Sequence, residues 1–124
     1  MLNFSEKRKQ PRIDVRIPLT YKELRATSTV SKGALTKNLS VGGVKFHSDG
    51  FISLSCRMIL EINLPLISKP LRAISKVAWI RKLPAGEDYE IGNQFLDMKK
   101  EDRSMITDFI KKAIIQPAVN PDQT

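Results

Sequence analysis

The sequence is poor in the residues that form disulfides and zinc sites. It contains one cysteine, Cys56, and one histidine in 124 residues. A single cysteine cannot form an internal disulfide and is typical of a protein in a reducing cytoplasm. One histidine and one cysteine are also too few ligands for a zinc site of the usual kind. We therefore expect a cytoplasmic protein without a disulfide or a metal.

Long hydrophobic runs are missing as well. No apolar stretch reaches the roughly 18 residues that span a membrane, and residues 1–7 lack the apolar core of a signal peptide. Hydrophobic residues make up 41% of this 14.0 kDa chain, which is enough for the core of one modest domain. The sequence thus predicts a single globular domain without a membrane span.

Two classes of function find little support. Aromatic residues make up 6% of the chain and most are predicted to face inward, so few are available to stack on nucleic-acid bases. The sequence shows no nucleophile–base constellation and no phosphate-cradling glycine loop, so an enzyme is not expected. A basic nucleic-acid-binding barrel stays open as an alternative, because the charge of the chain fits it.

Positive charge dominates the sequence. Lysine and arginine number 21 against 13 acids, which gives a net charge of +8 and a pI near 9.8. This balance indicates an anionic partner, for which nucleic acid, an acidic protein face, a membrane surface and a dinucleotide all qualify. Lys7, Arg8, Lys9 and Arg12 gather near the N-terminus against one acid, Glu6. Taken alone, such a run is as consistent with a solvated tail as with a binding arm.

Short strands are predicted along most of the chain. Ile13, Val15 and Ile17 begin an apolar alternation that continues to Tyr21, and Pro18 within it indicates an edge position or a bulge. The predicted strands cover residues 13–21, 28–39, 44–47, 57–64, 71–82 and 89–95. The fifth has apolar residues on both faces, which indicates a bent strand. Strands of this length separated by turn signals predict a small barrel.

The pattern changes to helical spacing after the last strand. An apolar stripe at this spacing consists of Met105, Ile106, Phe109, Ile110, Ala113 and Ile114. Acids precede this stripe and Lys111 and Lys112 follow late in it, as the helix dipole favours. The organisation we expect is a flexible arm over residues 1–12, a barrel over 13–98, a helix of the same domain over 99–116 and a tail over 117–124.

Two short motifs suggest the chemistry. Arg8 and Arg12 form an R-x-x-x-R, and Asn38, Ser40 and Gly43 form an N-x-S-x-x-G. Arginine presents a planar fork of donors that matches two phosphate oxygens, and its flat face stacks on bases. Amide and hydroxyl groups can read the edge of a base. The first motif is expected about 0.5 times by chance and the second only about 0.05 times, so their joint occurrence in this order is informative.

In this order and setting, the two motifs resemble those of the PilZ family of cyclic di-GMP receptors. The resemblance extends from Glu6 to about Ile115 and includes Val77 to Trp79 and Gly92 to Phe95, which are similar to late V-x-W and G-x-x-F signatures of the family. It implies a mainly β fold, with a six-stranded antiparallel barrel, an N-terminal arm and a C-terminal helix. It also implies a non-enzymatic receptor that binds cyclic di-GMP and relays the signal to a downstream protein.

The resemblance assigns a role to each motif residue. Arg8 and Arg12 take the positions that bind phosphate and guanine, Asn38 and Ser40 those that contact a guanine, and Gly43 the position that permits the turn and a close ligand approach. The alternative reading is that the asparagine and serine stabilise their own turn. A PilZ-like interaction module without a ligand is a further alternative, against which the intact motifs argue.

Three residues lie outside the motif positions. We expect Trp79 to be a buried anchor of the core rather than a ligand contact. Arg16 matches no motif position and is predicted to be a surface residue, although on the same face it could supplement the phosphate site. Lys7 lies where the family varies, and the sequence leaves open whether one cyclic di-GMP or an intercalated pair is bound.

Overall fold

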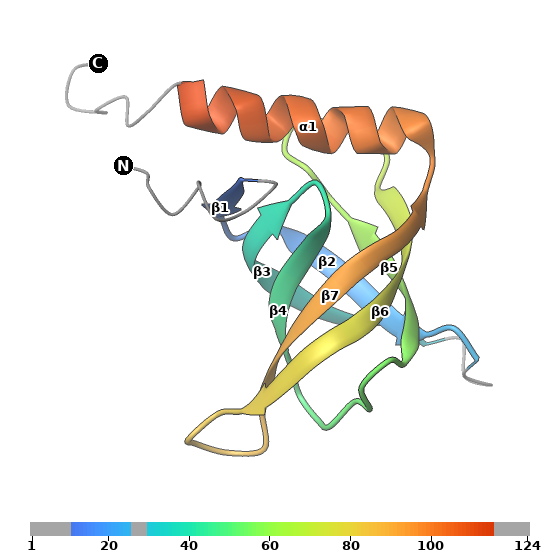
Figure 1. Ribbon diagram of the computed structural model, residues 1–124, viewed down its shortest axis with the longest axis vertical. Coiled ribbons are helices and arrows are strands. Elements are labelled where there is room, and N and C mark those ends of the chain that lie inside the picture. The colour runs from blue at the N-terminus through green and yellow to red at the C-terminus, as the bar shows by residue number, and fades with distance from the viewer. Residues whose placement is uncertain (1–10, 26–29, 116–124) are drawn as a thin grey trace.

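Seven strands and one helix form the described part of the chain, which is residues 11–25 and 30–115 of the computed structural model (Figure 1). The strands are β1 (Arg12–Asp14), β2 (Pro18–Glu23), β3 (Lys32–Ser40), β4 (Gly43–Ser48), β5 (Arg57–Ile62), β6 (Leu71–Lys82) and β7 (Tyr89–Met98), and the helix is α1 (Lys100–Ile115). The predicted fold class, mainly β with a C-terminal helix, is confirmed.

The strands form a closed antiparallel barrel. The sheet order is β1-β3-β2-β5-β6-β7-β4, and an additional pairing between β3 and β4 closes it. The barrel therefore has six strands, β2 to β7, as predicted, while β1 is an extra strand on β3. Closure leaves the barrel strands without the unpaired edges that open sheets expose.

The strand predicted over residues 13–21 is wrong as a single element, because the chain breaks between β1 and β2. At this break the side chain of the buried Thr36 joins β3 to the segment between β1 and β2: its hydroxyl accepts a hydrogen bond from the Ile17 N–H at 2.9 Å and donates one to the Val15 carbonyl. The β3–β4 register shifts at the same place, between Thr36 and Asn38. Pro18 opens β2, a strand paired on both sides, so of the two predicted alternatives, an edge position or a bulge, the edge position is wrong.

Alternation along the strands builds the core, as the sequence indicates. Inward side chains of β5, for example, are fully buried while their neighbours are not. The largest fully buried side chain is Phe46 of β4, and its ring centroid lies 5.0 Å from that of Tyr21. Helix α1 lies across one end of the barrel and contributes Ile106 and Ile110 to this core (Figure 1).

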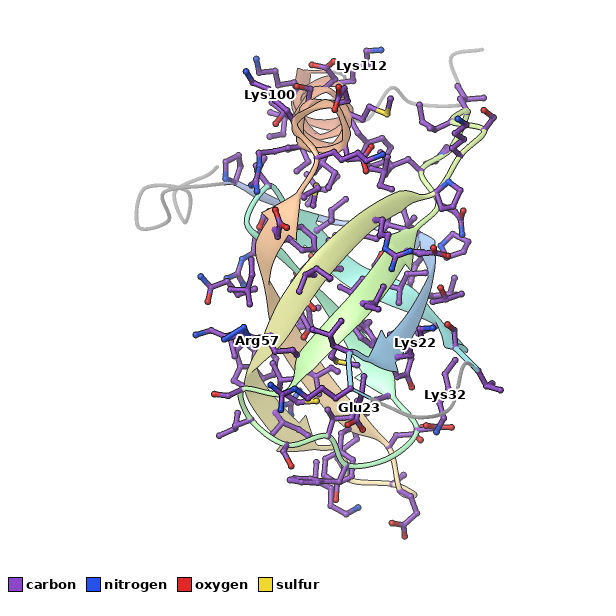
Figure 2. All side chains as sticks on the ribbon, turned by 90° about the vertical axis from the view of Figure 1, so that its right-hand side faces the viewer. Lys22, Glu23, Lys32, Arg57, Lys100 and Lys112 are labelled. Carbon is purple, nitrogen blue, oxygen red and sulfur yellow. The ribbon has the colours of Figure 1, made fainter. Side chains whose placement is uncertain are left out.

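The apolar stripe of the helix is narrower than predicted. Ile106 and Ile110 are buried and Phe109 is half-buried, but Met105 and Ile114 are exposed. Seen along its axis, α1 lies above the barrel rim rather than along the wall (Figure 2). A helix in this position contacts the barrel through one line of side chains, so the outer residues of the stripe stay in solvent.

Candidate ligand-binding site

The described motif residues lie in two neighbouring rows across the sheet. In the first row, Arg12 of β1 is opposite Ser40 of β3, which is opposite Gly43 of β4. In the second row, Asn38 is opposite Lys45 of β4. Directly paired residues of antiparallel strands point to the same face. The described residues of the two motifs thus meet on one face, beside the β3–β4 turn at the end of the barrel that α1 covers (Figure 1).

A concavity of about 530 Å³ lies over these rows and is lined by residues of β1, β3, β4, β6, β7 and α1. Arg12, Asn38, Ser40 and Gly43 all line it. Arg8, the fifth predicted site residue, lies outside the described residues, as does Lys7. The structure therefore brings together four of the five predicted residues and does not place the fifth.

Ser40 holds the turn between β3 and β4. Its hydroxyl oxygen accepts hydrogen bonds from the Gly42 N–H at 3.2 Å and the Gly43 N–H at 3.1 Å, and it donates to the Gly43 carbonyl at 3.4 Å. The side chain is buried. This geometry supports the turn-stabilising reading of Ser40, and a base contact would have to replace the long bond to Gly43. Asn38 makes no side-chain hydrogen bond within the described part of the chain, so its amide is available.

Gly43 allows two strands to approach each other closely. A Cβ at this position would overlap the backbone carbonyl oxygen of Asn93 and lie 3.3 Å from its carbonyl carbon. Gly43 pairs with Gln94 on β7, so the obstacle is the rigid backbone of the adjacent strand. The glycine is thus required by packing within the barrel, in addition to any close approach of a ligand.

Trp79 is not the buried anchor that we predicted. Its side chain is on the surface, 39% exposed, and lines the concavity. The indole lies against Gly92 of β7, where an added Cβ would be 2.5 Å from the indole Cε2. The β6–β7 register shifts between Val77 and Trp79, which turns Trp79 out of the inward row to which Val77 belongs. A glycine in a strand indicates close approach, and Gly92 was the available signal.

Glu90 organises the charges next to Trp79. Its side chain is 8% exposed, and its Oε1 accepts a hydrogen bond from the Arg81 Nη2 at 2.5 Å. Its Oε2 lies 3.8 Å from the Lys45 Nζ and 3.6 Å from the His47 Nε2. Burial by itself would raise the pKa of Glu90, but the hydrogen bond from Arg81 and the charges of Lys45 and Arg81 outweigh it and hold the pKa below its ordinary value. The carboxylate is therefore ionised at neutral pH.

The family follows from a comparison with known domain families. A family model described as the PilZ domain matches residues 6–112, which is most of the chain. The chain belongs to the PilZ domain family. No curated protein matches this PilZ domain at a significant level.

Solved structures with the same fold are distant in sequence. The Bacillus subtilis inhibitor of motility MotI (DgrA) matches with a TM-score of 0.73 and 17% identity over 90% of this chain and 53% of its own. The PilZ domain of Escherichia coli YcgR, solved with c-di-GMP, matches with a TM-score of 0.70 and 15% identity over 95% of this chain and 99% of its own. A c-di-GMP complex of MrkH from K. pneumonia matches with a TM-score of 0.66 and 16% identity over 88% and 52%. This chain spans about half the length of the MotI and MrkH chains.

Other residues of this PilZ domain line the concavity without belonging to either motif. Among them are Lys45, Gln94 and Arg103. Arg103 comes from the first half of α1 and does not belong to the apolar stripe that the sequence predicts for the helix. Its position at the site depends on how the helix crosses the barrel end, for which the sequence holds no local signal.

Arg16 lies beside the concavity rather than in it. It lines a neighbouring hollow of about 650 Å³ with Lys37 and others, and this hollow shares Asn38 and Lys45 with the first. The predicted surface position of Arg16 is confirmed.

Within residues 11–25 and 30–115, no three His, Cys, Asp or Glu residues form a group that could hold a metal ion. In the same part of this PilZ domain, no helix is long and apolar enough to cross a membrane.

Proposed function

We propose that this PilZ domain is a non-enzymatic receptor for cyclic di-GMP that relays binding to a downstream protein. The observation that carries the proposal is the meeting of Arg12, Asn38, Ser40 and Gly43 around one concavity. These are four of the five residues to which the family resemblance assigns ligand contacts. An arginine fork for phosphate and a free amide for a base edge are the groups that a guanine dinucleotide requires. The single Cys56 fits the cytoplasm, where we place the protein.

Calorimetric titration with cyclic di-GMP tests the proposal. We expect saturable binding to the chain of 124 residues, and the molar ratio at the midpoint of the titration gives the stoichiometry. GTP and a short single-stranded RNA serve as controls for a general anion site. Equal binding of all three, or no binding of cyclic di-GMP, would contradict a dinucleotide receptor. In the second case the ligand-free interaction module becomes the better description.

One observation favours the nucleic-acid alternative. Trp79 is exposed beside cationic side chains, and an exposed aromatic ring of this kind can stack on a base. A single such ring can stack on a base of a dinucleotide as well as on a base of an RNA strand, so it does not by itself favour RNA over a dinucleotide. The RNA titration separates the two functions, since a strand-binding surface should prefer the oligonucleotide.

Substitution of Asn38 by alanine should reduce base selectivity more than anion binding. The Asn38 amide is not engaged within the described structure, so its removal leaves the barrel and the phosphate contacts in place. We expect the preference for cyclic di-GMP over cyclic di-AMP to shrink by about tenfold, since a lost directed hydrogen bond costs about 0.5–1.5 kcal/mol or more. Ser40→Ala should also reduce selectivity, but with a loss of stability, because Ser40 holds the turn. Titration of both dinucleotides into each variant measures this, and native protein without a preference would contradict it.

The N-terminal segment should respond to the ligand. Residues 1–10 carry Lys7, Arg8 and Lys9, which repel one another until an anion neutralises them, and apart from Met1 their large apolar side chains are Leu2 and Phe4. The apolar surface is too small to offset an ordering cost of roughly 1–2 kcal/mol per residue. We therefore expect amides of residues 1–10 to be protected from hydrogen exchange only when cyclic di-GMP is bound. Protection in the free protein, or full exchange at saturation, would exclude closure of this arm over the ligand.

A further inference from the structure

Lys45 occupies the centre of the candidate site. It lies opposite Asn38 on one neighbouring strand and opposite Gly92 on the other, and Gly92 is in turn opposite Trp79. Lys45 also lines both hollows, that of about 530 Å³ and that of about 650 Å³. A cation in this position is accessible to an anion in either hollow.

Two contacts restrain the Lys45 side chain, which would otherwise be flexible. Its Nζ lies 3.8 Å from the Glu90 Oε2 and 6.0 Å from the centre of the Trp79 ring. The second contact is a cation–π interaction at the outer limit of the usual range. Only 27% of the side chain is exposed. A lysine held on two sides loses less conformational entropy on binding than a free one.

Glu90 is itself anchored from the far side. Arg81 of β6 donates a hydrogen bond to the Glu90 Oε1. The other carboxylate oxygen, Oε2, is directed at Lys45 and His47 of β4. Arg81 is 62% exposed, so the charge of Glu90 is fixed between a surface arginine and the site. Within the described residues, Glu90 is the one carboxylate within 4.0 Å of the Lys45 ammonium group. That ammonium has three donors, so an approaching anion can share it with Glu90.

We propose that Lys45 is a further ligand contact, donating to a phosphate group of the dinucleotide, and that Glu90 is a positioning residue that holds Lys45 for this contact. The proposal rests on the proposed function and adds a cation that belongs to neither motif. Arg12 approaches the concavity from β1 and Lys45 from β4, so the ligand would be held by charges on two different strands.

The first part of the test replaces Lys45. Lys45→Met keeps the length of the side chain and removes its charge, so affinity for cyclic di-GMP should fall about tenfold. Added salt should weaken the binding of cyclic di-GMP to Lys45→Met less than it weakens binding to the wild type. Lys45→Arg should restore most of the affinity, because the charge returns. Trp79 is the one tryptophan of the chain, so its fluorescence reports binding beside Lys45. Unchanged affinity in Lys45→Met would overturn the contact.

Lys82 offers a matched control. Its Nζ also lies near an aromatic ring, 5.8 Å from the centre of Tyr89, but Lys82 lines neither hollow. Lys82→Met removes the same charge from the protein and should leave the affinity within about twofold of wild type. An equal loss in Lys82→Met and Lys45→Met would show a general effect of net charge and would overturn the assignment to Lys45.

The second part tests Glu90 with a double-mutant cycle. Glu90→Gln should lower affinity about threefold when Lys45 is present, because Lys45 is no longer held in place. In the Lys45→Met background it should not lower affinity at all. A rise in affinity of the same size in both backgrounds would mean that Glu90 acts only as a nearby negative charge, and the positioning role would be overturned. Thermal unfolding of each variant confirms that the compared proteins are folded.

The same data separate the two proposals. Binding by the wild type with unchanged affinity in Lys45→Met would overturn the role of Lys45 and leave the receptor function standing. No binding of cyclic di-GMP by the folded wild type would overturn both.

Discussion

Replacing Arg12 with alanine should weaken cyclic di-GMP binding by well over tenfold, because a charge-assisted and bidentate contact is worth about 1.5–3 kcal/mol. Arg12 is exposed at the start of β1 and lines the concavity, so its loss should leave the barrel folded. Calorimetric titration measures the affinity, and unfolding curves check the fold. Arg8→Ala should have a similar effect, which follows from the motif alone. Lysine at either position should rescue binding only in part, since it lacks the planar fork.

Arg57 provides the control for this substitution. It is an exposed arginine on β5, a strand that does not border the concavity, and it lies on the barrel wall away from α1 (Figure 2). Arg57→Ala changes the net charge by the same amount and should leave affinity nearly unchanged. Wild-type affinity in both Arg8→Ala and Arg12→Ala, or an equal loss in Arg57→Ala, would contradict the assignment of the two motif arginines.

Gly43→Ala should lower the free energy of unfolding by about 3 kcal/mol, at the upper end of the usual cost of overpacking. The added Cβ would overlap the carbonyl oxygen of Asn93, and backbone atoms of a barrel strand cannot move aside as a flexible side chain can. The β4–β7 pairing must open, and the turn that Ser40 holds would move with it. Urea denaturation of the free protein measures the loss without reference to any ligand.

Gly50→Ala is the matched control. Nothing lies within 4 Å of a Cβ at Gly50, and its backbone is not in the left-handed region. The substitution should therefore be neutral or stabilise by up to about 1 kcal/mol, through the reduced entropy of the unfolded chain. Equal stability of Gly43→Ala and Gly50→Ala would show that β4 and β7 are farther apart than the structure indicates.

Much of the fold could be predicted because its signals are local. Alternation with period two marks the barrel strands, and the observed β6 begins and ends where the pattern placed it, at Leu71 and Lys82. The change to helical spacing placed the helix over 99–116, against Lys100–Ile115 in the structure. Four motif residues could be grouped because the chain carries them near one tight turn and one adjoining strand. These features depend only on residues that are close together in the sequence.

The remaining features depend on which strands meet and in which register. In an unbroken β6, Trp79 would continue the inward row of Ala73 and Val77, but the register shift after Val77 turns it outward. Thr36 likewise divides the first predicted strand through a contact across 19 residues. Lys45 has no motif, and it becomes central only because β4 lies between β3 and β7.

Periodicity and spacing therefore predicted the barrel and located the two motifs, and the resemblance of those motifs indicated the family, because all of these are patterns along the chain. The tertiary structure alone decided which other side chains face the site. The outward turn of Trp79, the ion pairs of Glu90 and the approach of Arg103 from α1 all join residues of different elements. Their positions follow from packing across the barrel, which no local pattern records.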